Sequence, residues 1–239
     1  MTPPSIGPLP TVLGVAWVIA LLFGAQAASG RDNFLIISGG VMAAGSFAAL
    51  LWFIAFYRGV GADERKRYPT GFAYLTLGPV YVGFLLATAL MLREITGTDG
   101  GDDLGRSWLL FALLVTFAVD TGAYGVGRSI GKHPMAPSIS SNKTWEGSVG
   151  GFISAVGAAL ILGLVLDLEV PVWLQAVIGA VVGVLAQWGD LIESKLKRIA
   201  AVKDAGSIIP GHGGLLDRLD SILLALPAVY FLLVTVFVP

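Results

Sequence analysis

The sequence predicts an all-α polytopic membrane protein with about seven transmembrane helices. Composition is the first reason: of 239 residues, 55% are hydrophobic and only 13% are charged, whereas a soluble domain carries about 25% charged residues. Too little charge remains to cover a water-facing surface. The second reason is that the apolar residues gather in long stretches, close to the roughly 20 residues that a helix needs to cross a bilayer.

Seven segments are candidate spans: 10–29, 34–57, 70–92, 107–126, 148–166, 171–189 and 219–238. Helices are expected because every backbone polar group must be satisfied internally in lipid, and the alternating short strands of a membrane barrel are not seen. We expect residues 1–106 to form an N-terminal scaffold of about three spans. Residues 107–239 are expected to form a catalytic region of about four spans and polar loops.

The connecting loops differ in charge. Loops 58–69, 127–147 and 190–218 hold 12 of the 15 basic residues. Positively charged loops stay in the cytoplasm, so we expect these loops and the N-terminus inside and the C-terminus outside. The sequence Ala25-Gln26-Ala27 resembles a signal-peptidase site, but no positive charge precedes it, and we expect the first span to be retained.

The ionisable side chains limit the metal chemistry. Cysteine is absent, which excludes disulfides and thiolate metal sites. Two histidines, His133 and His212, cannot form a multi-histidine site. A metal would therefore rest mainly on carboxylates, which favours a hard ion such as Mg²⁺.

Polar residues follow the fourth span. Asp120, Tyr124 and Arg128 are spaced i, i+4 and i+8, on one face of a helix. Four glycines between 122 and 131 would let a phosphate or another helix approach the backbone. Tight helix packing, with Asp120 and Arg128 only interfacial, is an equally good interpretation of this segment.

The next loop contains Pro134 and Pro137, which predict irregular backbone. It ends in a run of hydrogen-bond donors, from Ser140 through Asn142 and Lys143 to Thr144, directly before the fifth span. A helix N-terminus there would suit an anion. The alternative is an ordinary helix cap.

The sixth span ends at Asp190, where the apolar helix meets the cytoplasm. An amphipathic helix follows, with Asp190, Ser194 and Lys197 on one face. Glu193 is expected to form only a solvated pair with Lys197, worth a few tenths of a kcal/mol. We therefore predict a mild effect of Glu193→Gln.

The segment before the last span contains Gly211-His212-Gly213-Gly214. Such a loop exposes backbone N–H groups that can bind phosphate oxygens, although a plain turn is the alternative. Asp217 and Asp220 follow at i and i+3, and two like charges on one helix face favour a divalent cation between them.

Together these groups favour phosphoryl or nucleotidyl transfer at a membrane surface. The sequence lacks the GxxxxGK[ST] pattern of P-loop ATPases and the nucleophile elbow of serine hydrolases. Carboxylates for metal, basic groups for polyphosphate and close-approach glycines suit a reaction in which the protein positions reactants and neutralises charge. One substrate would come from water and one from lipid.

Two segments resemble the phosphatidate cytidylyltransferase (CDP-diacylglycerol synthase) family. Residues 194–220, SKLKRIAAVKDAGSIIPGHGGLLDRLD, are similar to its C-terminal motif without a mismatch, and residues 120–147, DTGAYGVGRSIGKHPMAPSISSNKTWEG, to its second conserved region. The likeness covers roughly 107–238. Ser141 stands where the family usually has proline, and the N-terminal half is shorter than in many members.

The resemblance implies a metal-dependent nucleotidyltransferase of phospholipid biosynthesis, with a cytoplasm-facing active site in the inner membrane. CTP and phosphatidate would give CDP-diacylglycerol and pyrophosphate. It implies that Asp190 and Asp217 hold a metal pair with Asp220 assisting, Mg²⁺ being expected and K⁺ an alternative at one position. It assigns CTP, phosphatidate and the bilayer as partners, assigns no nucleic acid, and leaves a homodimer open.

The resemblance also assigns the remaining site residues. The catalytic group would include Lys203 and His212, and Asp204 would orient Lys203, while Asp120 is either structural or a distant support for the metal. The substrate-binding residues would be Arg128, Asn142, Lys143, Ser194, Lys197, Arg198, Gly211, Gly213, Gly214 and Arg218, with Lys132 a weaker candidate. Alternatives are a related transferase acting on an ether-lipid or polyprenol phosphate and, from another class, an ion-coupled transporter using Asp120, Asp190 and Asp217.

Overall fold

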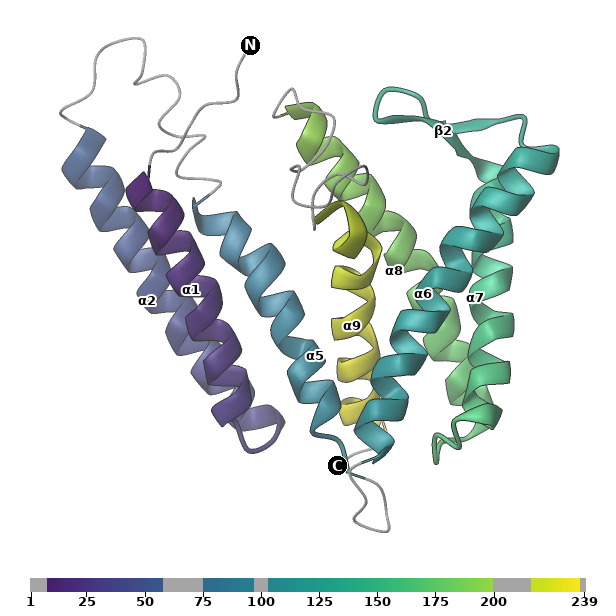
Figure 1. Ribbon diagram of the computed structural model, residues 1–239, viewed down its shortest axis with the longest axis horizontal. Helices are drawn as coiled ribbons and strands as arrows, with labels where there is room; N and C mark the ends of the chain where they lie inside the picture. The colour runs from purple at the N-terminus through teal and green to yellow at the C-terminus, as the bar shows by residue number, and fades with distance from the viewer. Residues whose placement is uncertain (1–7, 58–74, 97–102, 200–215, 237–239) are drawn as a thin grey trace. The chain divides into compact units, whose positions relative to one another are not determined.

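The computed structural model divides into two compact units, residues 1–91 and 92–239, each of which is described by itself. The structure describes residues 8–57, 75–96, 103–199 and 216–236 (Figure 1). The division expected from the sequence, at 106/107, stays a prediction.

The first unit contains α1 (Pro8–Ala27), α2 (Arg31–Tyr57) and a third helix. This helix begins at Leu75, passes through the π-helical segment η1 (Pro79–Phe84) and continues as α5 (Leu85–Arg93), whose last two residues are counted with the second unit. Pro79 lacks a backbone N–H, and the wider π-helical turn begins at this residue.

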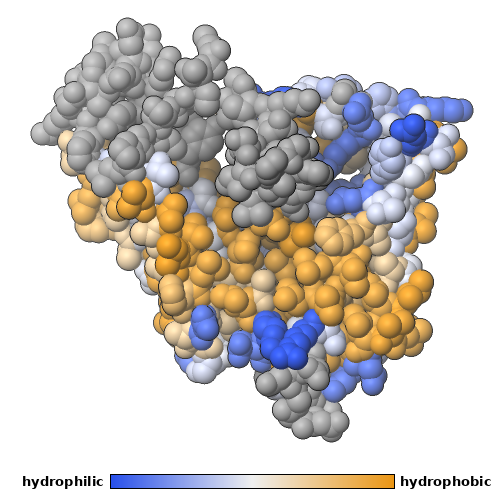
Figure 2. Space-filling model, viewed as in Figure 1, coloured by the Kyte–Doolittle hydropathy of each residue, from blue (hydrophilic) through white to orange (hydrophobic). Residues whose placement is uncertain are grey.

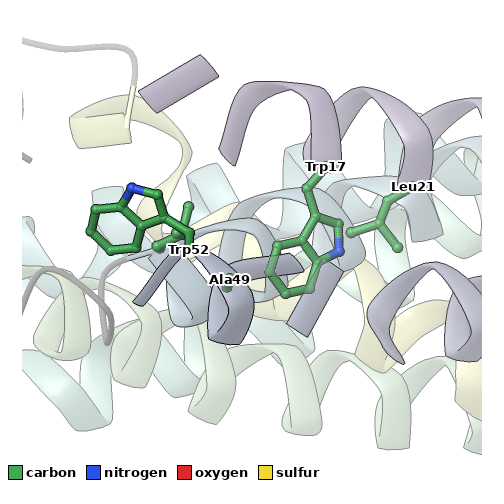
Figure 3. Close-up of a cluster of buried hydrophobic side chains, with 5 residues drawn as sticks. Trp17, Leu21, Ala49 and Trp52 are labelled. Atoms are coloured by element: carbon green, nitrogen blue, oxygen red, sulfur yellow. The ribbon is translucent and has the colours of Figure 1, made fainter. Parts of the chain in front are cut away.

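A small apolar core holds the first unit together. Its buried side chains come from α1, α2 and the start of the third helix, and are Trp17, Leu21, Ala49, Trp52 and Leu75 (Figure 3). A side chain at Gly45 would overlap the Trp17 ring, so the absence of a Cβ there lets α1 pack closely on α2.

In its described residues, the second unit is a bundle of four helices with a small hairpin at one end (Figure 1). Its elements are α6 (Asp103–Ile130), β1 (Pro134–Ala136), β2 (Ser140–Thr144), α7 (Trp145–Val165), α8 (Val172–Ile199) and α9 (Leu216–Val236). Helix α6 packs against the other three, α7 packs against α8, and α8 packs against α9.

Glycines allow these helices to approach one another closely. A Cβ on Gly147 of α7 would lie 2.8 Å from the carbonyl oxygen of Ala123 on α6. A Cβ on Gly189 of α8 would overlap the carbonyl oxygen of Asp220 on α9. Small residues at such crossings bring backbones together, and here they bring Asp190 and Asp220 to adjoining turns of two helices.

The described helices confirm an all-α polytopic membrane protein. Six are long and apolar enough to cross a bilayer, and the stretch Thr11–Ala27 within α1 is a shorter apolar helix. The figure of seven spans stays a prediction. Figure 2 shows hydrophobic residues covering the middle of the second unit and hydrophilic residues at its hairpin end, as lipid-covered helices with wet ends require.

Helix α8 runs without a break through the expected sixth span and the expected amphipathic helix to Ile199. One local expectation was wrong. The loop after the fourth span was expected to be irregular, but β1 and β2 pair antiparallel. Pro134 begins β1 and Pro137 lies in the turn, where neither has to donate a ladder hydrogen bond. The turn is closed by Ile139 N–H, which donates to Ala136 O at 3.0 Å.

Candidate functional site

The hairpin is anchored to the first turn of α7. Thr144 is the N-cap, with an extended backbone (φ −120°, ψ 153°), and its side chain accepts from Gly147 N–H at 3.1 Å. The ordinary helix cap, which was the alternative interpretation of this segment, is therefore present, and anion binding there stays a prediction. Trp145 N–H donates to His133 O at 3.0 Å. Glu146 reaches back to His133, with Oε2 3.2 Å from the backbone N and Oε1 2.5 Å from Nδ1.

This anchor holds Lys143, at the end of β2, over the end of the apolar part of α8. Lys143 Nζ forms an ion pair with Asp190 Oδ2. Ser194 Oγ donates to Asp190 Oδ1 at 3.3 Å, which confirms that Asp190 and Ser194 share a face of α8. One turn further along, Arg198 Nε donates to the carbonyl of Ile139 in the hairpin turn at 3.3 Å. Hairpin and α8 are thus joined at two points.

A second ion-pair cluster joins α8 to α9. Lys197 Nζ lies 2.7 Å from Asp217 Oδ1 and 2.5 Å from Glu193 Oε2. Glu193 is only 1% exposed, so the expectation of a solvated surface pair was wrong. Glu193 and Asp217 also lie close enough for their negative charges to repel each other, and the Lys197 ammonium offsets that repulsion. The burial arises because α9 covers this face of α8.

Three carboxylates repel one another where their helices approach: Asp120 on α6, Asp190 on α8 and Asp220 on α9. The negative charge of Asp120 is repelled by those of Asp190 and Asp220 and attracted by Lys143. Asp220 also accepts a hydrogen bond from the next residue, since Ser221 N–H donates to Asp220 Oδ1 at 2.7 Å. The arrangement concentrates negative charge where three helices meet.

A pocket of about 310 Å³ opens beside this charge, between α6, the hairpin, α7 and α8. The polar side chains that line it are Asp120, Tyr124, Ser140, Asn142, Lys143, Thr144, Ser148, Gln187 and Asp190. The sequence analysis named seven of these nine, on separate segments of the chain.

Gln187 was missed by the sequence analysis. Its Nε2 donates to Ser148 O of α7 at 3.1 Å and to Gly183 O of its own helix at 2.7 Å. It therefore links α7 to α8 at the wall of the pocket. The available signal was a polar amide within an otherwise apolar span, a costly choice in lipid.

The predicted metal ligands do not all meet at one point. Asp190 binds Lys143 while Asp217 binds Lys197. Within the described residues, no three Asp, Glu or His side chains gather closely enough to hold one ion. The donor chemistry still fits a hard cation, because Asp120, Asp190 and Asp220 are oxygen donors whose charges repel one another.

The other predicted residues fall into three groups. Asn142 lines the pocket, and Arg128 is exposed on α6 beside Tyr124. Arg218 belongs to α9, but its side chain is not described. The predictions for Lys203, Asp204, Gly211, His212, Gly213 and Gly214 lie outside the described residues.

Known proteins resemble most of this chain. The cytidylyltransferase family matches residues 8–236. A relative in Bacillus subtilis (strain 168) is 42% identical over 160 residues, which cover 67% of this chain and 57% of the relative. One in Staphylococcus saprophyticus is 46% identical over 132 residues, covering 55% and 51%. One in Staphylococcus haemolyticus is 35% identical over 189 residues, covering 79% and 68%. Each is named phosphatidate cytidylyltransferase.

The matched part of the chain spans little more than half the length of the first two relatives. The family match, however, takes in every described helix and both strands of the hairpin, including Asp120, Lys143, Asp190 and Asp217. The chain belongs to the cytidylyltransferase family.

Proposed function

We propose that this protein is a phosphatidate cytidylyltransferase, which transfers CMP from CTP to phosphatidate and releases pyrophosphate. The relatives that carry this name support the proposal. The structural observation that carries it is the Lys143–Asp190 contact beside the pocket. It joins a cationic and an anionic group at one end of a membrane-embedded bundle, where a nucleotide from water and a lipid can meet.

The reaction needs little covalent chemistry from the protein. A phosphate oxygen of phosphatidate attacks the α-phosphorus of CTP, the bond between that phosphorus and the bridging oxygen to the β-phosphorus breaks, and pyrophosphate leaves with that bond's electrons. The attacking phosphate is already ionised, so no strong general base is needed. The protein's task is to align the two phosphates and to offset their charge.

Lys143 and Lys197 are the described lysines suited to triphosphate oxygens. Lys143 forms an ion pair with Asp190, and Lys197 forms one with Asp217. Because both carboxylates belong to the candidate site, both ammonium groups lie within it. Asn142 and the N-terminus of α7 add neutral donors at the pocket wall. Arg198 fixes the hairpin turn to α8 and thereby the position of Lys143.

We also propose that the enzyme depends on Mg²⁺, held by Asp190 and Asp217 with Asp220 assisting, in a two-metal site in which K⁺ is an alternative occupant. A bound divalent cation would supply charge stabilisation of the attacking and leaving oxygens. The carboxylates are oxygen donors of the kind that Mg²⁺ prefers. The negative charges of Asp190 and Asp220 repel each other, and this repulsion favours a positive occupant.

The proposed location is the plasma membrane, with the N-terminus and the site in the cytoplasm. The supporting observation is the charge of the loops, since 12 of 15 basic residues lie in three alternate loops. In this orientation a nucleotide dissolved in the cytoplasm would reach the pocket directly.

The test is product formation in reconstituted membranes. Purified full-length protein in vesicles would receive labelled CTP and Mg²⁺ with one of three acceptors: phosphatidate, an ether-lipid phosphate or a polyprenyl phosphate. The expected result is CDP-diacylglycerol and equimolar pyrophosphate with phosphatidate. Preference for another acceptor would reassign the substrate, and ion flux without any CTP-dependent product would overturn the transferase assignment.

A further inference from the structure

Tyr124 and Arg128 form a linked pair on α6 beside the pocket. Tyr124 lines the pocket and yet is 66% exposed, so it lies at the open side. Arg128 follows one turn later, with Nη1 donating to Tyr124 Oη at 2.9 Å and Cζ 5.9 Å from the ring centroid. The phenol therefore holds the guanidinium in a defined position at the pocket entrance.

The charge of Arg128 is not neutralised within the described part of the chain. The positive charges of Lys143 and Lys197, in contrast, are neutralised, since each of these lysines is paired with carboxylates. A guanidinium has five N–H donors, and the Tyr124 hydroxyl accepts from one of its nitrogens. The remaining donors suit two oxygens of one phosphate, which Arg binds in a fork-like manner.

An apolar stripe on α6 leads to this pair. Leu110, Leu114 and Phe117 are exposed and are spaced i, i+4 and i+7. Continued along the helix, the same face carries Tyr124 and Arg128 at i+14 and i+18. A tyrosine at the end of an apolar helix face is typical of the membrane–water boundary, and a long basic side chain there reaches the headgroup level.

We propose that Tyr124 and Arg128 bind the phosphate of the acceptor phospholipid, whose acyl chains lie along the α6 stripe of Leu110, Leu114 and Phe117. The assignment rests on the proposed function and deepens it, because it says that the lipid binds at the α6 side of the pocket. The nucleotide would then bind at the side formed by the hairpin and α8. The acceptor phosphate would enter from the bilayer, next to Asp120 and within reach of Lys143 across the pocket.

The test separates lipid binding from nucleotide binding. Initial rates of the full chain in mixed micelles would be measured against the mole fraction of phosphatidate at saturating CTP, and against CTP at saturating phosphatidate. Arg128→Gln should raise the apparent KM for phosphatidate about ten-fold or more, with the KM for CTP and kcat within about two-fold of wild type. Arg128→Lys should recover part of the loss, because a point charge keeps attraction but not the fork. Tyr124→Phe should have a smaller effect of the same kind.

Arg106→Gln is the matched control, since Arg106 is an exposed arginine near the opposite end of the same helix. It should leave both KM values unchanged. Titration of dihexanoyl phosphatidate into the detergent-solubilised protein without CTP gives a readout independent of turnover, and Arg128→Gln should weaken this binding by a similar factor.

Three outcomes would overturn the assignment. An unchanged KM for phosphatidate in Arg128→Gln would show that the guanidinium does not hold the lipid. A rise in the KM for CTP alone would show that Arg128 binds the triphosphate of CTP and not the lipid. If the wild-type protein used no lipid phosphate at all, the proposed function would fail together with this assignment. If only the Arg128 variant behaved unexpectedly, the assignment alone would fail.

Discussion

Glu193 and Lys197 form a buried ion pair on α8, in which Lys197 Nζ lies 2.5 Å from Glu193 Oε2. The same ammonium reaches Asp217 on α9 at 2.7 Å. One positive charge is thus shared by two carboxylates on two helices. The sequence indicated that Glu193 is a surface residue of little consequence. In the structure it is instead part of the packing between α8 and α9.

Glu193→Gln is therefore expected to be harmful. The amide keeps the shape of the side chain but removes a charge that neutralises a nearly buried ammonium. We expect the free energy of unfolding to fall by about 1–3 kcal/mol, the usual cost of a buried polar group that loses its partner. Denaturant unfolding in mixed micelles would measure it. Lys195→Gln, exposed on the same helix, is the control, and equal stability of the two variants would contradict the prediction.

Lys143→Met should impair turnover far more than folding. The substitution leaves Asp190 without its ammonium partner and removes from the pocket wall a proposed donor for phosphate. We expect kcat/KM for CTP to fall about 100-fold, in the range for loss of one charge-stabilising group. Lys143→Arg should retain part of the activity. Unimpaired catalysis by Lys143→Met would show that this lysine only anchors the hairpin.

Asp217→Asn should nearly abolish activity while the protein still inserts into the membrane. The substitution removes a proposed metal ligand and one of the two carboxylates that share Lys197. Activity per inserted protein, with insertion followed by membrane extraction, is the measurement. Wild-type turnover would refute the metal role of Asp217, and a recovery at high Mg²⁺ would support it.

Gly189→Ala should separate α8 from α9. Its Cβ would overlap the carbonyl oxygen of Asp220, and overpacking of this kind costs about 1–3 kcal/mol. Because Asp190 and Asp220 adjoin this crossing, activity should fall together with stability. Gly157→Ala on α7 is the matched control, since a Cβ there meets nothing within 4 Å. Equal thermal midpoints for the two variants would argue against a tight crossing.

Sequence alone was sufficient for the elements whose signal is local. A helix in lipid must be long and apolar, and both properties can be read from consecutive residues. The i, i+4 spacing of Asp190 and Ser194 predicted a shared face, and their hydrogen bond confirms it. Thr144 could be recognised as a potential cap because capping depends on the next three residues only.

What the tertiary structure decided depends on residues far apart in the chain. Lys143 and Asp190 are 47 residues apart, and no periodicity predicts that the hairpin brings them into contact. The burial of Glu193 follows from the packing of α9 on α8 near Gly189, and the amphipathic pattern of α8 alone suggested exposure instead. Composition and spacing thus determined a membrane-embedded helical protein with clustered charge, while the packing of helices and hairpin decided which charges neutralise one another.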